Sequence, residues 1–118
     1  MRLFTLALIV LATAASAANA QDPVKVDSKH YKVEFENDQV RVLRITYGPG
    51  EKSIMHEHPN GIAISLTDSN FRMALPDGTT EEEGPQNGGR ATWAPATTHS
   101  PENIGKAAAE VLFIELKK

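Results

Sequence analysis

The tripeptide His56-Glu57-His58 is the part of this sequence whose residue types and spacing could do chemistry. On a β-strand, residues two apart point to the same face, so the two imidazoles would lie side by side and within reach of one ion. Imidazole nitrogen binds several divalent transition metals, and iron, manganese, zinc, nickel and copper all stay open. Histidines at this spacing also occur on exposed strands without a metal, so the pair alone leaves both interpretations open.

A third histidine, His99, lies in a segment that runs from Gly89 through Pro95 to Asn103. The sequence has no cysteine, which excludes disulfides, thiolate metal sites and cysteine nucleophiles. It also lacks a serine nucleophile elbow, a phosphate-binding glycine loop and a dinucleotide fingerprint. The histidines are therefore the candidate site.

The elements that must position the histidines are short strands. Tyr31, Val33 and Phe35 alternate with charged residues, which is the period of a half-buried strand, and turn residues such as Pro76-Asp77-Gly78 separate similar segments. The predicted strands are 31–36, 39–47, 53–58, 62–67, 71–75, 79–83, 90–94 and 110–116, with 95–105 as a loop that carries His99. About eight short strands at regular spacing predict an all-β sandwich or barrel.

With these motifs, the sequence resembles the cupins. A glycine, five residues and His-x-His form their first motif, matched by Gly50, His56 and His58. Their second motif is matched by Gly89, Pro95, His99 and Asn103. The resemblance covers about His30 to Leu116 and implies a single cupin-type jelly-roll β-barrel of short antiparallel strands, with His56, His58 and His99 as inward-pointing metal ligands.

One residue of the cupin pattern is missing. The glutamate expected after the second histidine would fall at Ile62 or Ala63, and both are apolar. Glu102 could reach in from its loop, or a water could take this place, whereas Glu57 is expected on the opposite face of its strand. Three neutral histidines leave a divalent ion its full charge, which predicts a strong Lewis acid that favours an anionic or chelating ligand.

The chain divides into three segments. Residues 1–20 have a positive start, an apolar run and the ending Ala18-Asn19-Ala20, the pattern of a signal peptide cleaved before Gln21. Residues 21–29 have little apolar content and predict a flexible leader, and 30–118 form the barrel domain. The protein is therefore expected to be exported, to the periplasm or outside the cell.

Charge and hydropathy restrict the partners. Without residues 1–20, which contain Arg2, the 12 Lys and Arg fall to 11 against 15 Asp and Glu, a net charge of −4. This balance gives no footprint for nucleic acid or anionic lipid, and no later segment is long and apolar enough to span a membrane. A small, anionic molecule is the expected partner. The apolar segment 111–116 must be covered, either by a homodimer partner or by the barrel core.

The sequence also predicts where five further side chains lie. Trp93 and Phe71 are predicted to lie in the core or the pocket wall. Arg72 is expected to point to solvent, with an inward anion clamp as the alternative, and His30 is expected at the surface. Asn103 is expected to tie its loop to the barrel.

The sequence is compatible with three functions. The first is a metal-dependent, dioxygenase-like oxidoreductase that acts on a small anionic molecule. The second is a non-catalytic protein that binds a metal or a small ligand, because a fold does not fix a function. The third is a degenerate barrel without a metal.

Overall fold

The structure, a computed structural model, describes residues 21–118. The predicted signal peptide, 1–20, lies outside the described residues. A short helix, α1 (Pro23–Val26), is followed in this range by nine strands. They are β1 (Tyr31–Glu36), β2 (Val40–Tyr47), β3 (His56–His58), β4 (Gly61–Ser65), β5 (Ser69–Ala74), β6 (Thr80–Gln86), β7 (Arg90–Ala94), β8 (Thr97–Asn103) and β9 (Ala109–Leu116).

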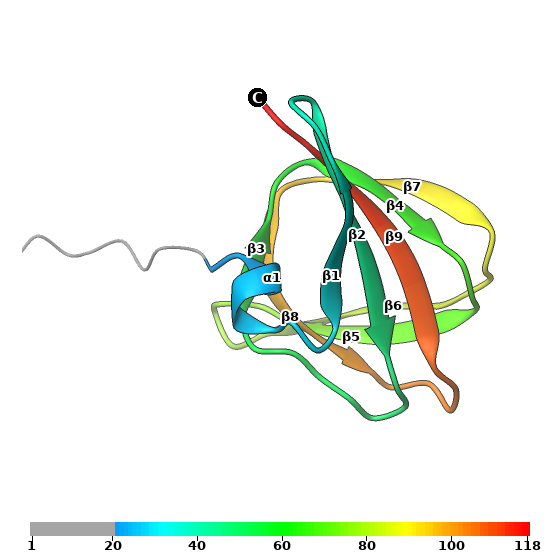
Figure 1. The fold of residues 1–118 in the computed structure, drawn as a ribbon. Helices are drawn as coiled ribbons and strands as arrows, with labels where there is room; N and C mark the ends of the chain where they lie inside the picture. Colours follow the sequence, from blue (N-terminus) through cyan, green and yellow to red (C-terminus); the bar gives the residue numbers. More distant parts are fainter. Residues whose placement is uncertain (1–20) are drawn as a thin grey trace, which may run out of the picture.

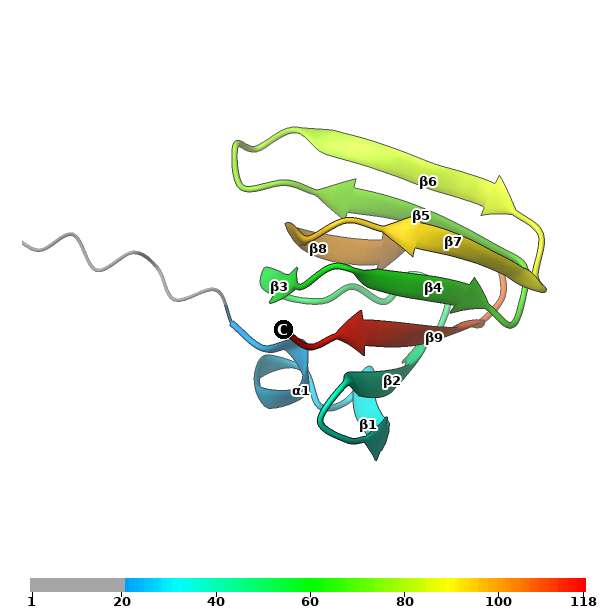
Figure 2. The same ribbon diagram turned by 90° about the horizontal axis from the view of Figure 1, so that it is seen from above.

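The strands form two sheets that enclose the core (Figures 1 and 2). One sheet has the order β1-β2-β9-β4-β7 and the other β3-β8-β5-β6, and each pair of neighbours is antiparallel. The all-β prediction is confirmed. β9 lies between β2 and β4, so the sheet itself covers both edges of the apolar segment 111–116.

The core consists of the side chains that alternate inward from both sheets. On β2 these are Leu43, Ile45 and Tyr47, which are 0%, 8% and 1% exposed. Phe71 of β5 meets them from the other sheet, and Phe113 of the neighbouring strand β9 belongs to the same cluster. Burial of each such side chain contributes about 1.5–3 kcal/mol, and this apolar contact holds the two sheets together.

The prediction of a loop over 95–105 is wrong, because β8 occupies most of this segment. β8 pairs with β3 on one side and β5 on the other. Its residues that share the inward face are His99, Pro101 and Asn103, so the strand lacks the alternation of apolar and polar residues that reveals a strand in a sequence. Ladder hydrogen bonds to two neighbours define it instead.

The prediction of a flexible leader over 21–29 also differs from the structure, since α1 and its flanking residues pack against the barrel. The Asp22 side chain caps α1 by accepting a hydrogen bond from the Val24 N–H at 3.0 Å, and Pro23 is buried. Arg41 of β2 donates to both Asp22 carboxylate oxygens at 2.8 and 3.0 Å. Apart from Pro23 and Val24, which pack against the barrel, these contacts are polar, so the low apolar content of the segment did not indicate them. Within 21–118, no helix has the length and apolar character needed to cross a membrane.

Asn103 fixes the end of β8, as expected. It is 0% exposed, and its side-chain amide donates to the carbonyls of Tyr47, Gly48 and Ala107 at 3.1, 3.2 and 2.9 Å. Gly50, the first residue of the cupin pattern, has a φ of +77°, a conformation that favours glycine. These contacts close the turn that precedes the histidine strand.

The structure also tests the predicted positions of four other side chains. Phe71 is buried and Arg72 points outward, where it contacts Glu82, so both predictions are confirmed. The prediction for Trp93 is wrong: it is 59% exposed, because it lies on the outer face of the edge strand β7. His30, expected at the surface, is only 6% exposed, since its ring stacks on Tyr47 at a centroid distance of 4.2 Å.

Candidate metal centre

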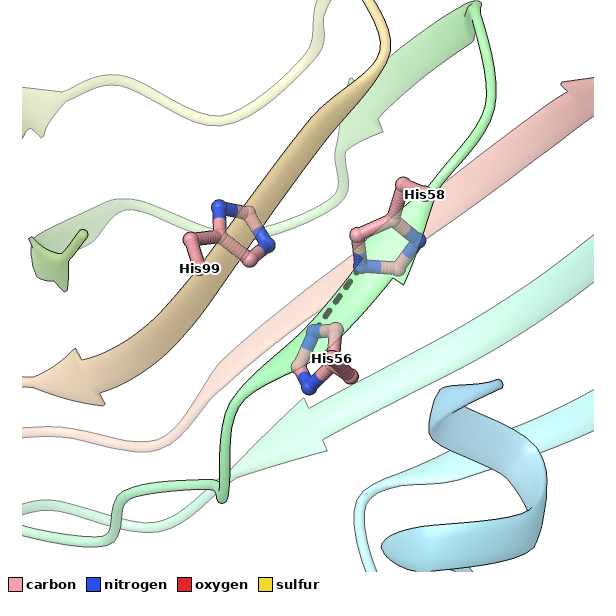
Figure 3. A group of neighbouring side chains, drawn as sticks. All are labelled: His56, His58 and His99. Carbon is pink, nitrogen blue, oxygen red and sulfur yellow. Dashed lines mark hydrogen bonds between the residues drawn. The ribbon is translucent and has the colours of Figure 1, made fainter. Parts of the chain in front are cut away.

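The β3–β8 pair brings the three predicted histidines together. His56 and His58 point inward from β3, and His99 lies directly opposite His56 in the ladder (Figure 3). The Nε2 atoms of His56 and His58 are 3.0 Å apart. One ring nitrogen from each of the three histidines lies within 4.8 Å of the others. Three imidazoles from two strands therefore converge on one point.

Burial keeps these imidazoles in the form that can bind a metal. His56 and His58 are 1% and 4% exposed. Burial, together with the neighbouring His58, lowers the pKa of His56 to about 4. Burial, with His58 and His56 beside it, lowers the pKa of His99 to about 3. Both rings are neutral at pH 7, and only a neutral ring has a lone pair to give to an ion.

The donor set fits a divalent transition metal. The Nδ1 atom of His56 lies 2.9 Å from the Ile54 carbonyl oxygen, which can only accept, so Nδ1 carries the proton and the lone pair is on Nε2, the atom that faces Nε2 of His58. The Nε2 atom of His99 is buried without a hydrogen-bond partner. A buried polar atom without a partner is costly, and an ion at this point would satisfy it. Nitrogen donors of this kind suit transition metals better than calcium or magnesium.

A series of hydrogen-bonded polar groups connects His56 to the N-terminal segment. The Ser53 hydroxyl lies 3.2 Å from Nδ1 of His56 and donates to the Asp27 carboxylate at 2.5 Å. The same carboxylate accepts from Nδ1 of His30 at 2.7 Å. Metal-binding histidines commonly have such partners on the ring nitrogen that faces away from the ion, because these partners fix the ring orientation. No pattern in the sequence predicts this series of contacts.

Neither carboxylate considered as a substitute for the missing glutamate lies in the cluster. Glu57 is exposed, as the alternation of β3 predicts. Glu102 lies on the outer face of β8, 3.7 Å from Arg72. Among the residues that the structure describes, the cluster that could hold an ion therefore consists of the three histidines.

A different carboxylate, Glu115 of β9, lies behind His58. It is 5% exposed, and its Oε1 atom is 3.8 Å from Nδ1 of His58. Arg41 donates to both of its oxygens at 2.8 and 3.0 Å. Burial raises the pKa of Glu115, but His58 and Arg41 together outweigh this effect and hold the pKa below its usual value. The sequence signal was an acidic residue on the otherwise apolar inward face of β9, which carries Ala109, Val111 and Phe113.

Two of the three histidines border a cavity of about 140 Å³ between the two sheets. His58 and His99 line it, and Tyr31, Phe71 and Phe113 form much of its apolar wall. Cavities that bind drug-sized molecules measure about 300–1,000 Å³, so this cavity suits a smaller molecule.

Comparison with solved structures identifies the fold. A cupin domain from Bordetella pertussis Tohama I is 21% identical and superposes with a TM-score of 0.64 over 75% of this chain and 92% of that one. A conserved protein with a double-stranded β-helix domain from Klebsiella pneumoniae is 17% identical, with a TM-score of 0.57 over 73% and 74% of the two chains. Bacillus subtilis oxalate decarboxylase, which has Mn(II) centres, is 22% identical, with a TM-score of 0.51 over 66% of this chain and 22% of that one.

These similarities show that the chain forms a small cupin-type jelly-roll domain, as the resemblance of its motifs implied. No protein-family model matches the sequence, and no curated protein matches it. At these identities, the similarity shows the fold.

Acid should destabilise the metal-free protein through its buried histidines. Unfolded histidines take up protons near pH 6.5, whereas His56 and His99 resist protonation until about pH 4 and about pH 3. The unfolded state therefore binds more protons in this window, and the free energy of unfolding should fall as the pH decreases from 6.5 to 4. Each histidine contributes a slope of up to about 1.4 kcal/mol per pH unit.

Urea denaturation after treatment with a chelator measures this slope. If a His99→Gln variant showed an equally steep slope, His99 would not be one of the histidines that cause the pH dependence.

Two glutamates of β9 offer a matched test of burial. Glu115→Gln breaks the buried pair with Arg41, which keeps Asp22 as a partner, and should lower the free energy of unfolding by about 1–3 kcal/mol. Glu110→Gln, on the same strand, breaks the partly exposed pair with Arg44 and should cost about 0–1 kcal/mol. Urea denaturation of both variants measures the difference, and equal losses would show that the buried pair has no special role.

Proposed function

We propose that this domain holds one divalent transition metal on His56, His58 and His99 and binds a small anionic molecule beside it. The observation that supports the metal is the convergence of three ring nitrogens within 4.8 Å of one another in a buried site. The lowered pKa values of His56 and His99 support it further, because they keep these ligands deprotonated in neutral solution. The Mn(II) centres of the structurally similar oxalate decarboxylase are consistent with a metal in this fold.

The proposed ligand set leaves coordination positions for a second molecule. Three protein ligands are typical of catalytic rather than structural zinc sites, which are closed by four. The His58 and His99 side chains also line the cavity, so those positions would face it. A bound divalent ion would act as a Lewis acid that attracts and polarises an oxygen of the ligand.

The charge balance of the site favours an anionic ligand. The three ligands are neutral, and the nearby Glu115 carboxylate, which shares the Arg41 guanidinium with Asp22, lies behind His58 and outside the ligand set. The ion would therefore keep most of its positive charge. Because the cavity wall is largely apolar, the attraction between the ion and an anionic oxygen would be stronger than in water. Carboxylate and enolate oxygens are the ligands that this arrangement fits.

Export is part of the proposal and rests on the pattern of residues 1–20 alone. Cleavage before Gln21 would keep the contacts of the N-terminal segment described above. Glu57 of β3, for example, donates its N–H to the Gln21 carbonyl at 3.0 Å.

Metal analysis of the purified protein tests the ligand set. The protein should contain about one transition-metal ion per chain after exposure to iron, manganese or zinc. His56→Ala and His99→Ala should each remove most of it, since a site loses its geometry when one of three ligands is lost. Glu102→Gln is the matched control, because Glu102 lies on the outer face of β8, and it should keep the wild-type content. Unchanged metal in the histidine variants would disprove the ligand assignment.

Oxygen consumption distinguishes an enzyme from a binding protein. We propose a dioxygenase-like oxidoreductase as the catalytic form of this function, because the open side of the site would admit both a ligand and oxygen. The iron-loaded protein is expected to consume oxygen with at least one member of a panel of small carboxylates, diketones and phenols, and the His56→Ala variant should not. Metal and ligand binding without oxygen uptake would identify a binding protein.

A further inference from the structure

The wall of the cavity has an uneven distribution of charge. Among the described residues that line it, none is a lysine or arginine, and the one carboxylate is Glu83 of β6. The other polar lining residues outside the histidines and tyrosines are uncharged: Ser65, Ser69, Gln86 and Thr92. An anionic ligand would therefore find a positive partner only at the proposed ion.

The strand register explains how Glu83 faces the cavity. Residues directly opposite each other in an antiparallel pair share one face of the sheet, and Glu83 lies opposite Phe71, a buried core residue. Its neighbour Glu82 lies opposite Arg72 and contacts it on the outer face at 3.4 Å. β6 is the edge strand of its sheet (Figure 2), so Glu83 keeps contact with solvent and stands at the mouth of the cavity.

The surroundings of Glu83 are unfavourable for additional negative charge. Burial raises the pKa of its carboxyl group, and the neighbouring Glu81 raises it further. No hydrogen bond or ion pair joins Glu83 to another side chain in the described part of the chain. The carboxylate is therefore available to a ligand.

Glu83 and the histidines lie at different levels of the barrel. Glu83 is level with Phe71 on β5, and Phe71 is level with Asn103 on β8. Asn103 is four residues from His99, which corresponds to roughly 13 Å along the strand at about 3.3 Å per residue. The cavity thus has a histidine end and an acidic end, separated by uncharged side chains.

We infer that the cavity selects a small molecule with one oxyanion end, for the histidine-held ion, and a hydrogen-bond donor or cation at its other end, for Glu83. A molecule with a second anionic end is rejected there by repulsion between like charges. This inference rests on the proposed function, because the ion holds the first end. It adds the charge pattern of the ligand.

Three six-carbon probes differ only in the group at the far end: 6-aminohexanoate carries an ammonium, hexanoate a methyl and adipate a second carboxylate. Calorimetric titration of the metal-loaded protein should give the tightest binding for 6-aminohexanoate and the weakest for adipate. Glu83→Gln should reduce the ratio of the adipate Kd to the 6-aminohexanoate Kd at least about fivefold, the scale of one charge pair about 4 Å apart in water. Glu83→Lys should reverse the order.

Glu82→Gln is the matched control, because the adjacent side chain faces outward, and it should leave the ratio unchanged. The same samples are assayed for metal. A sample without metal, or one in which none of the probes binds, would overturn the proposed function and this inference with it. Bound metal with a ratio that Glu83→Gln does not change would overturn the inference alone.

Discussion

His56 and His99 face each other across the β3–β8 pair, and the whole site depends on this register. Side chains alternate between the two faces of a strand, so a slip by one residue would turn His56 and His58 outward and bring Glu57 inward. β3 is only three residues long and cannot fix this register alone. β8 also pairs with β5, and this second pairing holds β8 in position. The apolar core between the sheets in turn fixes β5.

The barrel accommodates a polar cluster in a small core. Three imidazoles and the Glu115–Arg41 pair occupy inward or partly buried positions that apolar side chains would otherwise fill. Local departures from the hydrophobic pattern concentrate at functional sites, because a packed polar group costs stability unless it has a partner or a ligand. Here the partners are specific: a carbonyl and a hydroxyl at His56, and a paired carboxylate behind His58.

The N-terminal segment is part of the support of the site. Asp22 shares the Arg41 guanidinium with Glu115, the carboxylate behind His58. Asp27 reaches His56 through Ser53. Both histidines of β3 are therefore connected to residues that precede the first strand. Such outer contacts orient metal ligands and influence how firmly they hold an ion.

The sequence by itself determined the three histidines and the all-β class, because the spacing of His56 and His58 and the period-2 pattern of most strands are local properties. The cupin-type barrel was implied by the resemblance of its two motifs. The sequence missed β8 and the order of 21–29, whose contacts are polar or come from ladder hydrogen bonds and leave no hydrophobic period. It also placed His30 at the surface and Trp93 in the core or pocket wall, whereas the stacking of His30 on Tyr47 and the edge position of β7 decide their exposure. The tertiary structure alone brought Glu115 behind His58 and Glu83 to the mouth of the cavity, because both positions depend on pairing between strands distant in the sequence.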